Sequence, residues 1–137
     1  MSEKRIRAIY EGRLKTWADA RSPALRIAFE NVPLNPANGE TYLKVFLFPA
    51  QAVNLDLAGE STTFKGVFQV SIVVPISKGS GAALGIKDEL SALFVSNALL
   101  TDGVVTVRQL TPASAAPALS GDSEYIVPVS FQYRADS

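Results

Sequence analysis

Cysteine and histidine are both absent from this chain of 137 residues. Without cysteine there are no disulfides and no thiolate nucleophile, which agrees with a reducing, intracellular site of assembly. Without histidine, any hydroxyl nucleophile would need a lysine or carboxylate base, and no spacing singles one out. The pair Asp88-Glu89 lies on a predicted helix, where adjacent residues point to different faces. The sequence therefore predicts a non-enzymatic protein with no cofactor and no metal site.

Neither sign of charge dominates, because 13 basic residues balance 13 acidic ones. This neutrality argues against a general attraction to nucleic acid or to anionic membranes. No apolar run approaches the roughly 18 residues needed to span a bilayer, and the first residues lack the apolar core of a secretion signal. We therefore expect the protein to be made in the cytoplasm. Basic side chains exceed acidic ones within residues 1–30, which is typical of a solvated helix face and would also suit head-to-tail pairing of subunits.

Hydrophobic periodicity predicts two helices and about five strands in one domain that spans residues 1–137. Apolar residues recur at helical spacing over 2–19 and 82–99. Alternating or continuous apolar and β-branched residues predict strands at 25–30, 41–49, 63–75, 104–110 and 125–134. The order α-β-β-β-α-β-β indicates an α+β fold, with a mostly antiparallel sheet covered by helices on one face. Pro128 places its strand at an edge of the sheet or at a bulge.

Two of the predicted strands are apolar on both faces. In 41–48, Leu43, Val45 and Leu47 alternate with Tyr42, Phe46 and Phe48, and strand 63–74 shows the same property. A sheet with helices on one face needs only one apolar face. The second face is therefore covered either by another subunit or by helices on both sides, and the former is the preferred interpretation.

Three segments admit a functional interpretation beside a structural one. Lys78-Gly79-Ser80-Gly81 precedes a helix, but it lacks the residue order of a phosphate-binding loop and is better explained as a glycine-dependent turn. The basic first helix carries Tyr10 and Trp17, which could stack on bases but lie on its apolar stripe. The connection 50–62 is long for a compact domain, which is typical of a functional loop.

The order and spacing of several short motifs resemble the bacteriophage tail terminator-like family. The resemblance covers nearly the whole chain, and its most specific part is the strand Gly66-x-Phe68-Gln69-Val70. The motifs, in chain order, are Pro33-x-Asn35-Pro36, Tyr42-Leu43-x-Val45, Pro49-Ala50, Gly66-x-Phe68-Gln69-Val70-Ser71-Ile72, Gly79-x-Gly81 and a helix ending near Leu93-Phe94.

What the resemblance implies is a structural role in long, non-contractile phage tails, often encoded by prophages. Members are small tail-completion proteins that form a ring, typically of six subunits, on the last ring of the tail tube. The ring stops tube polymerisation and presents the surface to which the head docks. The implied partners are other copies of the chain, the tail tube protein and the head–tail connector, with DNA passing through the ring. The implied location is the virion tail, after assembly in the bacterial cytoplasm.

The family supplies no catalytic residue to transfer, so the motif residues are expected to define the fold. These are Gly66, Phe68, Gln69, Val70, Gly79 and Gly81. Subunit contacts are expected in three connections, 33–38, 53–60 and 111–120. The residues singled out there are Pro33, Leu34, Asn35, Pro36, Val53, Leu55, Asp56 and Leu57.

Two other classes of function remain open at this point. In one, the chain is a small-molecule-binding or enzymatic α+β domain that uses 50–62 as a lid over a deep polar pocket. In the other, it is a nucleic-acid-binding module, which would show binding that falls steeply with salt.

Overall fold

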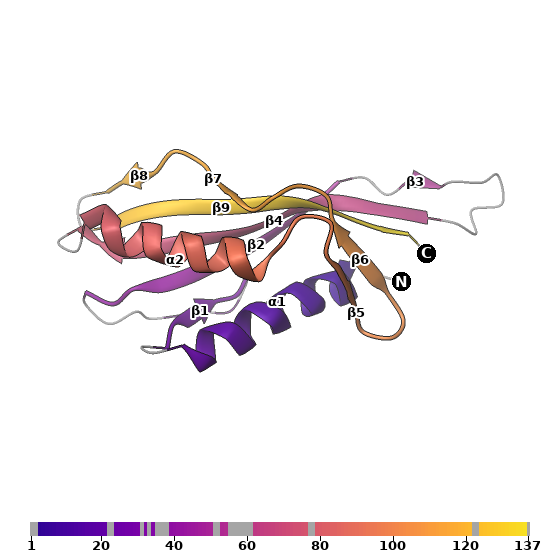
Figure 1. The fold of residues 1–137 in the computed structure, drawn as a ribbon, viewed down its shortest axis with the longest axis horizontal. Helices are drawn as coiled ribbons and strands as arrows, with labels where there is room; N and C mark the ends of the chain where they lie inside the picture. Colours follow the sequence, from indigo (N-terminus) through magenta and orange to yellow (C-terminus); the bar gives the residue numbers. More distant parts are fainter. Residues whose placement is uncertain are drawn as a thin grey trace.

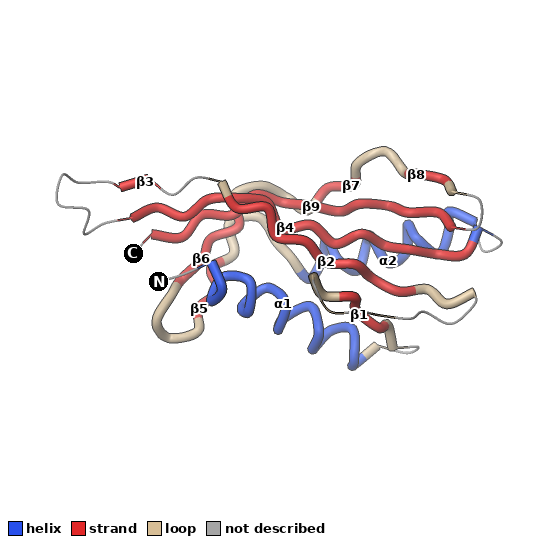
Figure 2. Tube along the Cα trace, turned by 180° about the vertical axis from the view of Figure 1, so that it is seen from behind, coloured by secondary structure: helices blue, strands red, loops and turns tan. Residues whose placement is uncertain are grey.

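A computed structural model describes residues 3–21, 24–30, 32, 34, 39–50, 53–54, 62–76, 79–121 and 124–136. These residues form a long, curled sheet with both described helices on one of its faces (Figure 1). Viewed from behind, the strands lie in front of α2 (Figure 2). The core lies between this face of the sheet and the two helices.

The elements differ in length, from two long helices and three long strands to several short ones. They are α1 (Glu3–Ala20), β1 (Arg26–Ala28), β2 (Tyr42–Pro49), β3 (Val53–Asn54), β4 (Thr62–Pro75), α2 (Gly79–Leu93), β5 (Leu99–Thr101), β6 (Thr106–Gln109), β7 (Ser114–Ala115), β8 (Leu119–Ser120) and β9 (Glu124–Asp136). The α+β class is confirmed, but the predicted five-strand count and the order α-β-β-β-α-β-β are wrong. Among the described residues, four short strands add to the predicted ones.

The sheet runs in the order β1-β2-β4-β9-β6-β5. Its centre is the antiparallel pair of β4 and β9, which is in register from Thr63 opposite Asp136 to Pro75 opposite Glu124. The other described pairings are also antiparallel, with one exception: β1 runs parallel to β2. The sequence predicted a mostly antiparallel sheet, and the parallel pair at this edge is where the sheet departs from that prediction.

Helix α1 matches its prediction within one residue at each end. Its buried residues Ile6, Tyr10 and Leu14 recur at the helical spacing that defines an apolar stripe. Gly12 lies on the opposite, exposed side, where an added Cβ would meet no atom within 4 Å. The stripe therefore faces the sheet, and glycine is not required at position 12.

Helix α2 begins and ends earlier than the predicted range 82–99. Gly79 and Gly81 belong to its first turn rather than to a glycine-dependent connection, and a Cβ at Gly81 would meet nothing within 4 Å. Asn97 has a left-handed φ of 68°, so the chain leaves the helical path there. The buried side chain of Gln109 donates a hydrogen bond of 3.1 Å to the carbonyl of Phe94, which helps to satisfy the end of the helix.

The residues after α2 form a hairpin instead of a continued helix. Leu99–Thr101 pairs with Thr106–Gln109, and Asp102-Gly103 makes the turn between these two strands. The connection 111–120, which the sequence did not predict to form strands, adds two short strands to one edge of β9. Pairing of β6, β7 and β8 with the distant strand β9 thus gives structure to segments with little periodicity of their own.

Aromatic side chains make up the centre of the core. The Tyr10 ring packs against Phe68 at 5.2 Å and against Phe131 at 5.0 Å between centroids, and Phe94 contacts Phe68 and Phe131. The hydroxyls of Tyr10 and Tyr133 are buried, and no described group donates or accepts a hydrogen bond there. Burial raises the pKa of Tyr133 to about 12, so this hydroxyl stays protonated.

Gly66 lies on β4 between Pro49 of β2 and Tyr133 of β9. A Cβ at this position would lie 2.5 Å from the Tyr133 hydroxyl and 2.6 Å from the carbonyl oxygen of Phe48. Both distances are shorter than van der Waals contact, so a side chain at residue 66 would force the Phe48 backbone and the Tyr133 side chain to move. Glycine is therefore required here by packing.

Pro128 lies in β9, which is central to the sheet rather than at its outermost edge. Its carbonyl accepts a hydrogen bond from the Ala116 amide on the side where β7 and β8 pair. Those two pairings flank Pro128 without including it. The missing N–H of proline therefore falls in a gap between two short strands, where no ladder hydrogen bond is lost.

Candidate functional site

The face of the sheet opposite the helices carries a mixture of apolar and polar side chains. Strand register brings Phe46 beside Gln69, Phe48 beside Val67, and Gln69 beside Ser130. At one end of this helix-free face, Tyr42, Ser71 and Val73 are buried. The alternative interpretation, that helices cover both faces, is thus wrong for the described helices. What covers the helix-free face in an assembly remains a prediction.

Phe46 and Phe48 of β2 project from this face. Their rings stack at 6.0 Å between centroids with planes 13° apart, and Phe48 is 51% exposed. Phe48 also lines a hollow of about 380 Å³ together with Pro49, Val67 and Leu110. Exposed aromatic groups beside apolar hollows are typical of surfaces that bind other proteins.

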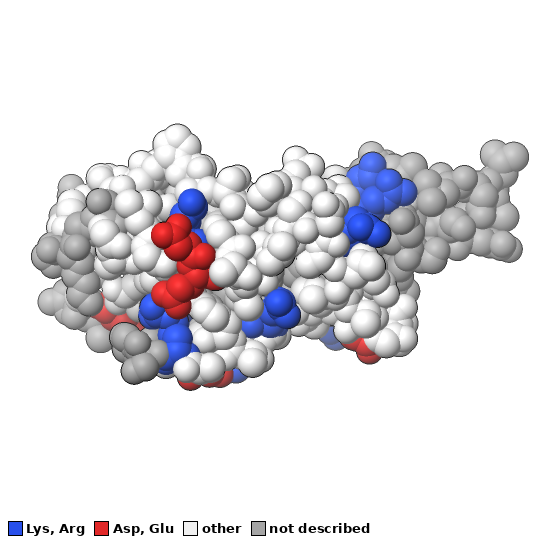
Figure 3. Space-filling view, viewed as in Figure 1, with Lys and Arg blue, Asp and Glu red and all other residues white. Residues whose placement is uncertain are grey.

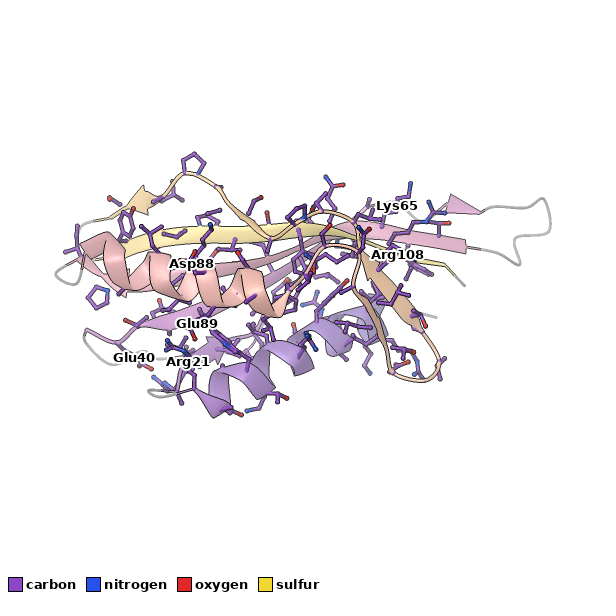
Figure 4. The ribbon with its side chains drawn as sticks, viewed as in Figure 1. Arg21, Glu40, Lys65, Asp88, Glu89 and Arg108 are labelled. Atoms are coloured by element: carbon purple, nitrogen blue, oxygen red, sulfur yellow. The ribbon has the colours of Figure 1, made fainter. Side chains whose placement is uncertain are left out.

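A row of three cationic residues crosses three neighbouring strands. Lys65 on β4 lies opposite Arg134 on β9, and Arg134 lies opposite Arg108 on β6. We call these three residues the basic row. Lys65 and Arg108 are exposed, and their charged groups make no ion pair with any residue that the structure describes. Figure 4 shows both side chains at the same end of the sheet, and Figure 3 shows basic groups there, apart from the acidic groups over α2.

A second feature is a groove between α1 and the residues that follow β1, with a volume of about 410 Å³. We call it the α1 groove. Its lining residues are mostly apolar or acidic: Arg7, Ala8, Glu11, Gly12, Lys15, Phe29, Glu30 and Val32. An Arg7 nitrogen lies 3.7 Å from Glu11 and 3.3 Å from Glu30, so one guanidinium serves two carboxylates.

The two carboxylates of the α1 groove are compensated unequally. Glu30 accepts a hydrogen bond of 2.6 Å from the Leu47 amide, at the part of β2 that extends past β1. The Oε2 atom of Glu11 is buried without a hydrogen bond from any described residue. Burial raises the pKa of Glu11, Arg7 lowers it, and Glu30 raises it further. Glu11 Oε2 therefore lacks a hydrogen-bond donor, although the lining as a whole balances two basic residues against two acidic ones.

The hairpin of β5 and β6 is fixed by polar contacts at its turn. Asp102 Oδ1 accepts hydrogen bonds from the amides of Val105 (2.8 Å) and Val104 (2.9 Å), and Arg5 binds Oδ2 at 3.0 Å. These contacts lower the pKa of Asp102 to about 2, and the hydrogen bonds from the Val105 and Val104 amides contribute most. The contact with Arg5 also ties the hairpin to α1.

Most arginines near the start of the chain are engaged within the subunit. Arg5 pairs with Asp102, Arg7 with Glu11 and Glu30, and Arg21 binds Glu89 through two hydrogen bonds of 2.7 and 3.1 Å. Arg26 binds Glu40 in the same bidentate way. The idea that residues 1–30 form a free basic face for a neighbouring subunit is therefore wrong for these arginines.

The predicted contact segments are only partly described. Among the residues singled out, Leu34 is half-buried, and Val53 pairs with Thr63 through the backbone. The others lie outside the described residues: Pro33, Asn35, Pro36, Leu55, Asp56 and Leu57. In the third segment, Leu119 of β8 is 61% exposed. A subunit contact at any of these positions stays a prediction.

The residues of the family motif contact other parts of the same subunit. Phe68 and Val70 are buried in the core, and Gln69 on the other face donates a hydrogen bond of 3.1 Å to the Ser71 hydroxyl. Some motif residues, such as Gly66 and Phe68, are therefore required by packing, whereas Gly81 is not.

The described part of the chain contains no group of three or more potential metal ligands. None of its helices is long and apolar enough to cross a bilayer. The hollow next to the 50–62 connection is lined mainly by apolar groups, with Lys65 and Gln132 as its polar members. It does not match the deep polar pocket that a lid-covered enzyme site would need.

Sequence reasoning missed both the basic row and the α1 groove. The members of the basic row are far apart in the chain, and only the register of β4, β9 and β6 brings them together. A partial signal was available, because Arg108 and Arg134 each lie in a predicted strand among apolar neighbours.

Comparison with known proteins agrees with the resemblance noted in the sequence. A search of curated proteins gives no match. A solved structure, whose name states no function, is 40% identical to the chain, with a TM-score of 0.85, and the match covers 98% of this chain and 96% of that one. The family model described as phage tail terminator protein matches residues 5–133. The chain therefore belongs to the phage tail terminator protein family.

Proposed function

We propose that this protein caps the phage tail tube as an oligomeric ring, stops its polymerisation and provides the surface to which the head docks. The observation that carries the proposal is the family match over residues 5–133, which supports a structural role in the tail. The partners are other copies of the chain, the tail tube protein and the head–tail connector. The protein acts in the virion tail after assembly in the bacterial cytoplasm.

The surface chemistry supports a role in assembly. The helix-free face presents Phe46 and Phe48, and other large apolar side chains are exposed at the hairpin and near the α1 groove, including Val104 (67%), Val32 (57%) and Leu99 (56%). Exposed apolar patches of this kind are typical of surfaces that become buried against proteins.

The test is tail-tube polymerisation in the presence of the purified protein. Tube protein is allowed to polymerise with and without the chain, and tube lengths are measured by negative-stain electron microscopy. The expected result is shorter tubes with a ring of extra density at one end. The Phe46→Ser, Phe48→Ser double variant tests the helix-free face in the same assay. Unchanged tube lengths at saturating wild-type protein, with no density at either end, would show that the chain does not cap tubes.

A further inference from the structure

The helix-free face of the sheet is positively charged, although the chain as a whole has zero net charge. Lys44 lies on this face near the start of β2, and the basic row crosses the face near the other end of β2. The acidic residues of the described strands are the first and the last residue of β9, so they lie at the two ends of the sheet. Between these ends, the described strands contribute cations and no carboxylate to the face.

The cations of this face differ from the other charges in how they are paired. Lys44, Lys65 and Arg108 make no ion pair with any residue that the structure describes. By contrast, carboxylates of α1, α2 and the connections pair with basic groups of the same subunit. These are Glu11, Asp19, Glu30, Glu40, Asp88, Glu89 and Asp102. An anion that neutralises the helix-free face is therefore expected from another molecule.

Between Lys44 and the basic row, the outward positions of β2 and β4 are mainly apolar. Strand register places Phe46 beside Gln69 and Phe48 beside Val67. The two phenylalanine rings stack on each other, and Phe48 is half-exposed. An aromatic centre with charged groups at its margin is typical of a surface that binds another protein.

Duplex DNA and a second copy of the chain fit this surface less well than a different protein does. A phosphate backbone offers no apolar group to cover Phe46 and Phe48. Two copies joined through the same face would place one positively charged surface against another. The carboxylates that pair within the subunit would have to leave their partners before they could bind this face of a neighbouring copy. The surface is therefore suited to a different protein that offers carboxylates among apolar groups.

We propose that the helix-free face, from Lys44 to the basic row, binds the end of the tail tube through an apolar tube surface that carries carboxylates. The inference rests on the proposed capping function, and it assigns the contact face and the chemistry of the partner. Burial of Phe46 and Phe48 supplies affinity. The cations at the margin steer association and fix its orientation, and this attraction weakens as salt screens it.

The first test reverses charge on the proposed contact face. The Lys65→Glu, Arg108→Glu double variant should raise the protein concentration that halves the mean tube length by at least roughly tenfold, because like charges then face the carboxylates of the tube. The control, Lys4→Glu with Lys15→Glu, makes the same change in net charge at exposed positions of α1. It should cap tubes like the wild type. Both variants should remain folded by circular dichroism.

The second test uses salt, which gives a result that a folding defect would not reproduce. For the wild type, the concentration that halves the mean tube length should rise with sodium chloride. The Lys65→Ala, Arg108→Ala double variant should need more protein at low salt and should respond less to added salt. An identical response of the two proteins would contradict a contact made through these cations.

Two further measurements separate the tube from the other partners. Sedimentation should give the same oligomeric state for the wild type and for the Lys65→Glu, Arg108→Glu double variant. Fluorescence anisotropy should show no loss of duplex DNA binding that is unaccompanied by a loss of capping. A changed oligomeric state would assign the face to a second copy, and loss of duplex binding alone would assign it to DNA. Either result would overturn the inference.

The contact and the proposed function fail in different ways. Wild-type protein that leaves tube lengths unchanged would contradict capping itself, and with it this contact. Wild-type protein that shortens tubes, together with normal capping by the Lys65→Glu, Arg108→Glu double variant, would contradict the contact alone.

Discussion

The two faces of the central sheet are built from the same strands but differ in what covers them. The inner face places Phe68, Val70 and Ile72 against the helices, where they are at most 3% exposed. The helix-free face places Phe48 and Lys65 in solvent and keeps Gln69 only half-buried. Alternation along β2 and β4 thus separates a face that stabilises the subunit from one that is available to partners. Substitutions on the two faces should therefore affect different measurements.

The largest effect is expected at the centre of the inner face. Phe68→Ala should lower the free energy of unfolding by about 3–5 kcal/mol, because it removes a fully buried ring and leaves a cavity among aromatic neighbours. Urea denaturation followed by tryptophan fluorescence measures this change. A loss below about 1 kcal/mol would mean that the core is less tightly packed than its contacts indicate.

A smaller loss in the free energy of unfolding is expected at Gly66, which has no side chain on either face. Gly66→Ala should cost about 1–3 kcal/mol, since its Cβ would overlap the Tyr133 hydroxyl and the Phe48 carbonyl. Gly12→Ala is the control, and it should instead stabilise α1 by about 1 kcal/mol. Equal effects of the two substitutions would contradict the packing requirement at residue 66.

On the helix-free face, the expected effect on the subunit is small. Phe48→Ala should change the free energy of unfolding by less than about 1 kcal/mol, because the ring is half-exposed in the isolated chain. The contrast with Phe68→Ala is the direct measure of how the two faces differ. Thermal unfolding of dilute protein provides the stability, and tube-length measurements provide the effect on assembly.

The smallest effect concerns the pH dependence of the hairpin. Because the folded pKa of Asp102, about 2, lies below its ordinary value of 3.8, its ionisation stabilises the fold above about pH 4. This contribution is lost as the pH falls through 2. The difference in melting temperature between wild type and Asp102→Asn should therefore be largest near pH 6 and shrink toward pH 2. A difference independent of pH would show that the carboxylate charge does not matter.

Local patterns predicted the long elements well, because their burial is periodic. The stripe of α1 and the alternation of β2, β4 and β9 are properties of neighbouring residues, so the sequence alone shows them. The end of α2 was mispredicted because Leu99 and Leu100 continue the apolar pattern, whereas the helix ends at Leu93 and Asn97 takes a left-handed φ in the turn that follows. The parallel pairing of β1 with β2 could not be predicted, because no local sequence pattern indicates the relative direction of two strands.

The candidate site was less predictable than the fold. The row of Lys65, Arg134 and Arg108 can be recognised only when the register of the strands is known. In the same way, the groove combines one helix with the residues after a three-residue strand. Most residues expected from sequence to form contacts lie outside the described part of the chain, so their role stays a prediction.

The position of β9 determines when the subunit can complete its fold during synthesis. This strand lies between β4 and β6, yet it follows every other described element along the chain. Until the ribosome has released it, β4 lacks its longest partner, and Phe68 lacks the ring of Phe131. Contacts between such distant segments form slowly. A nascent chain therefore cannot present a finished surface to any partner, and only a completed subunit can enter an assembly.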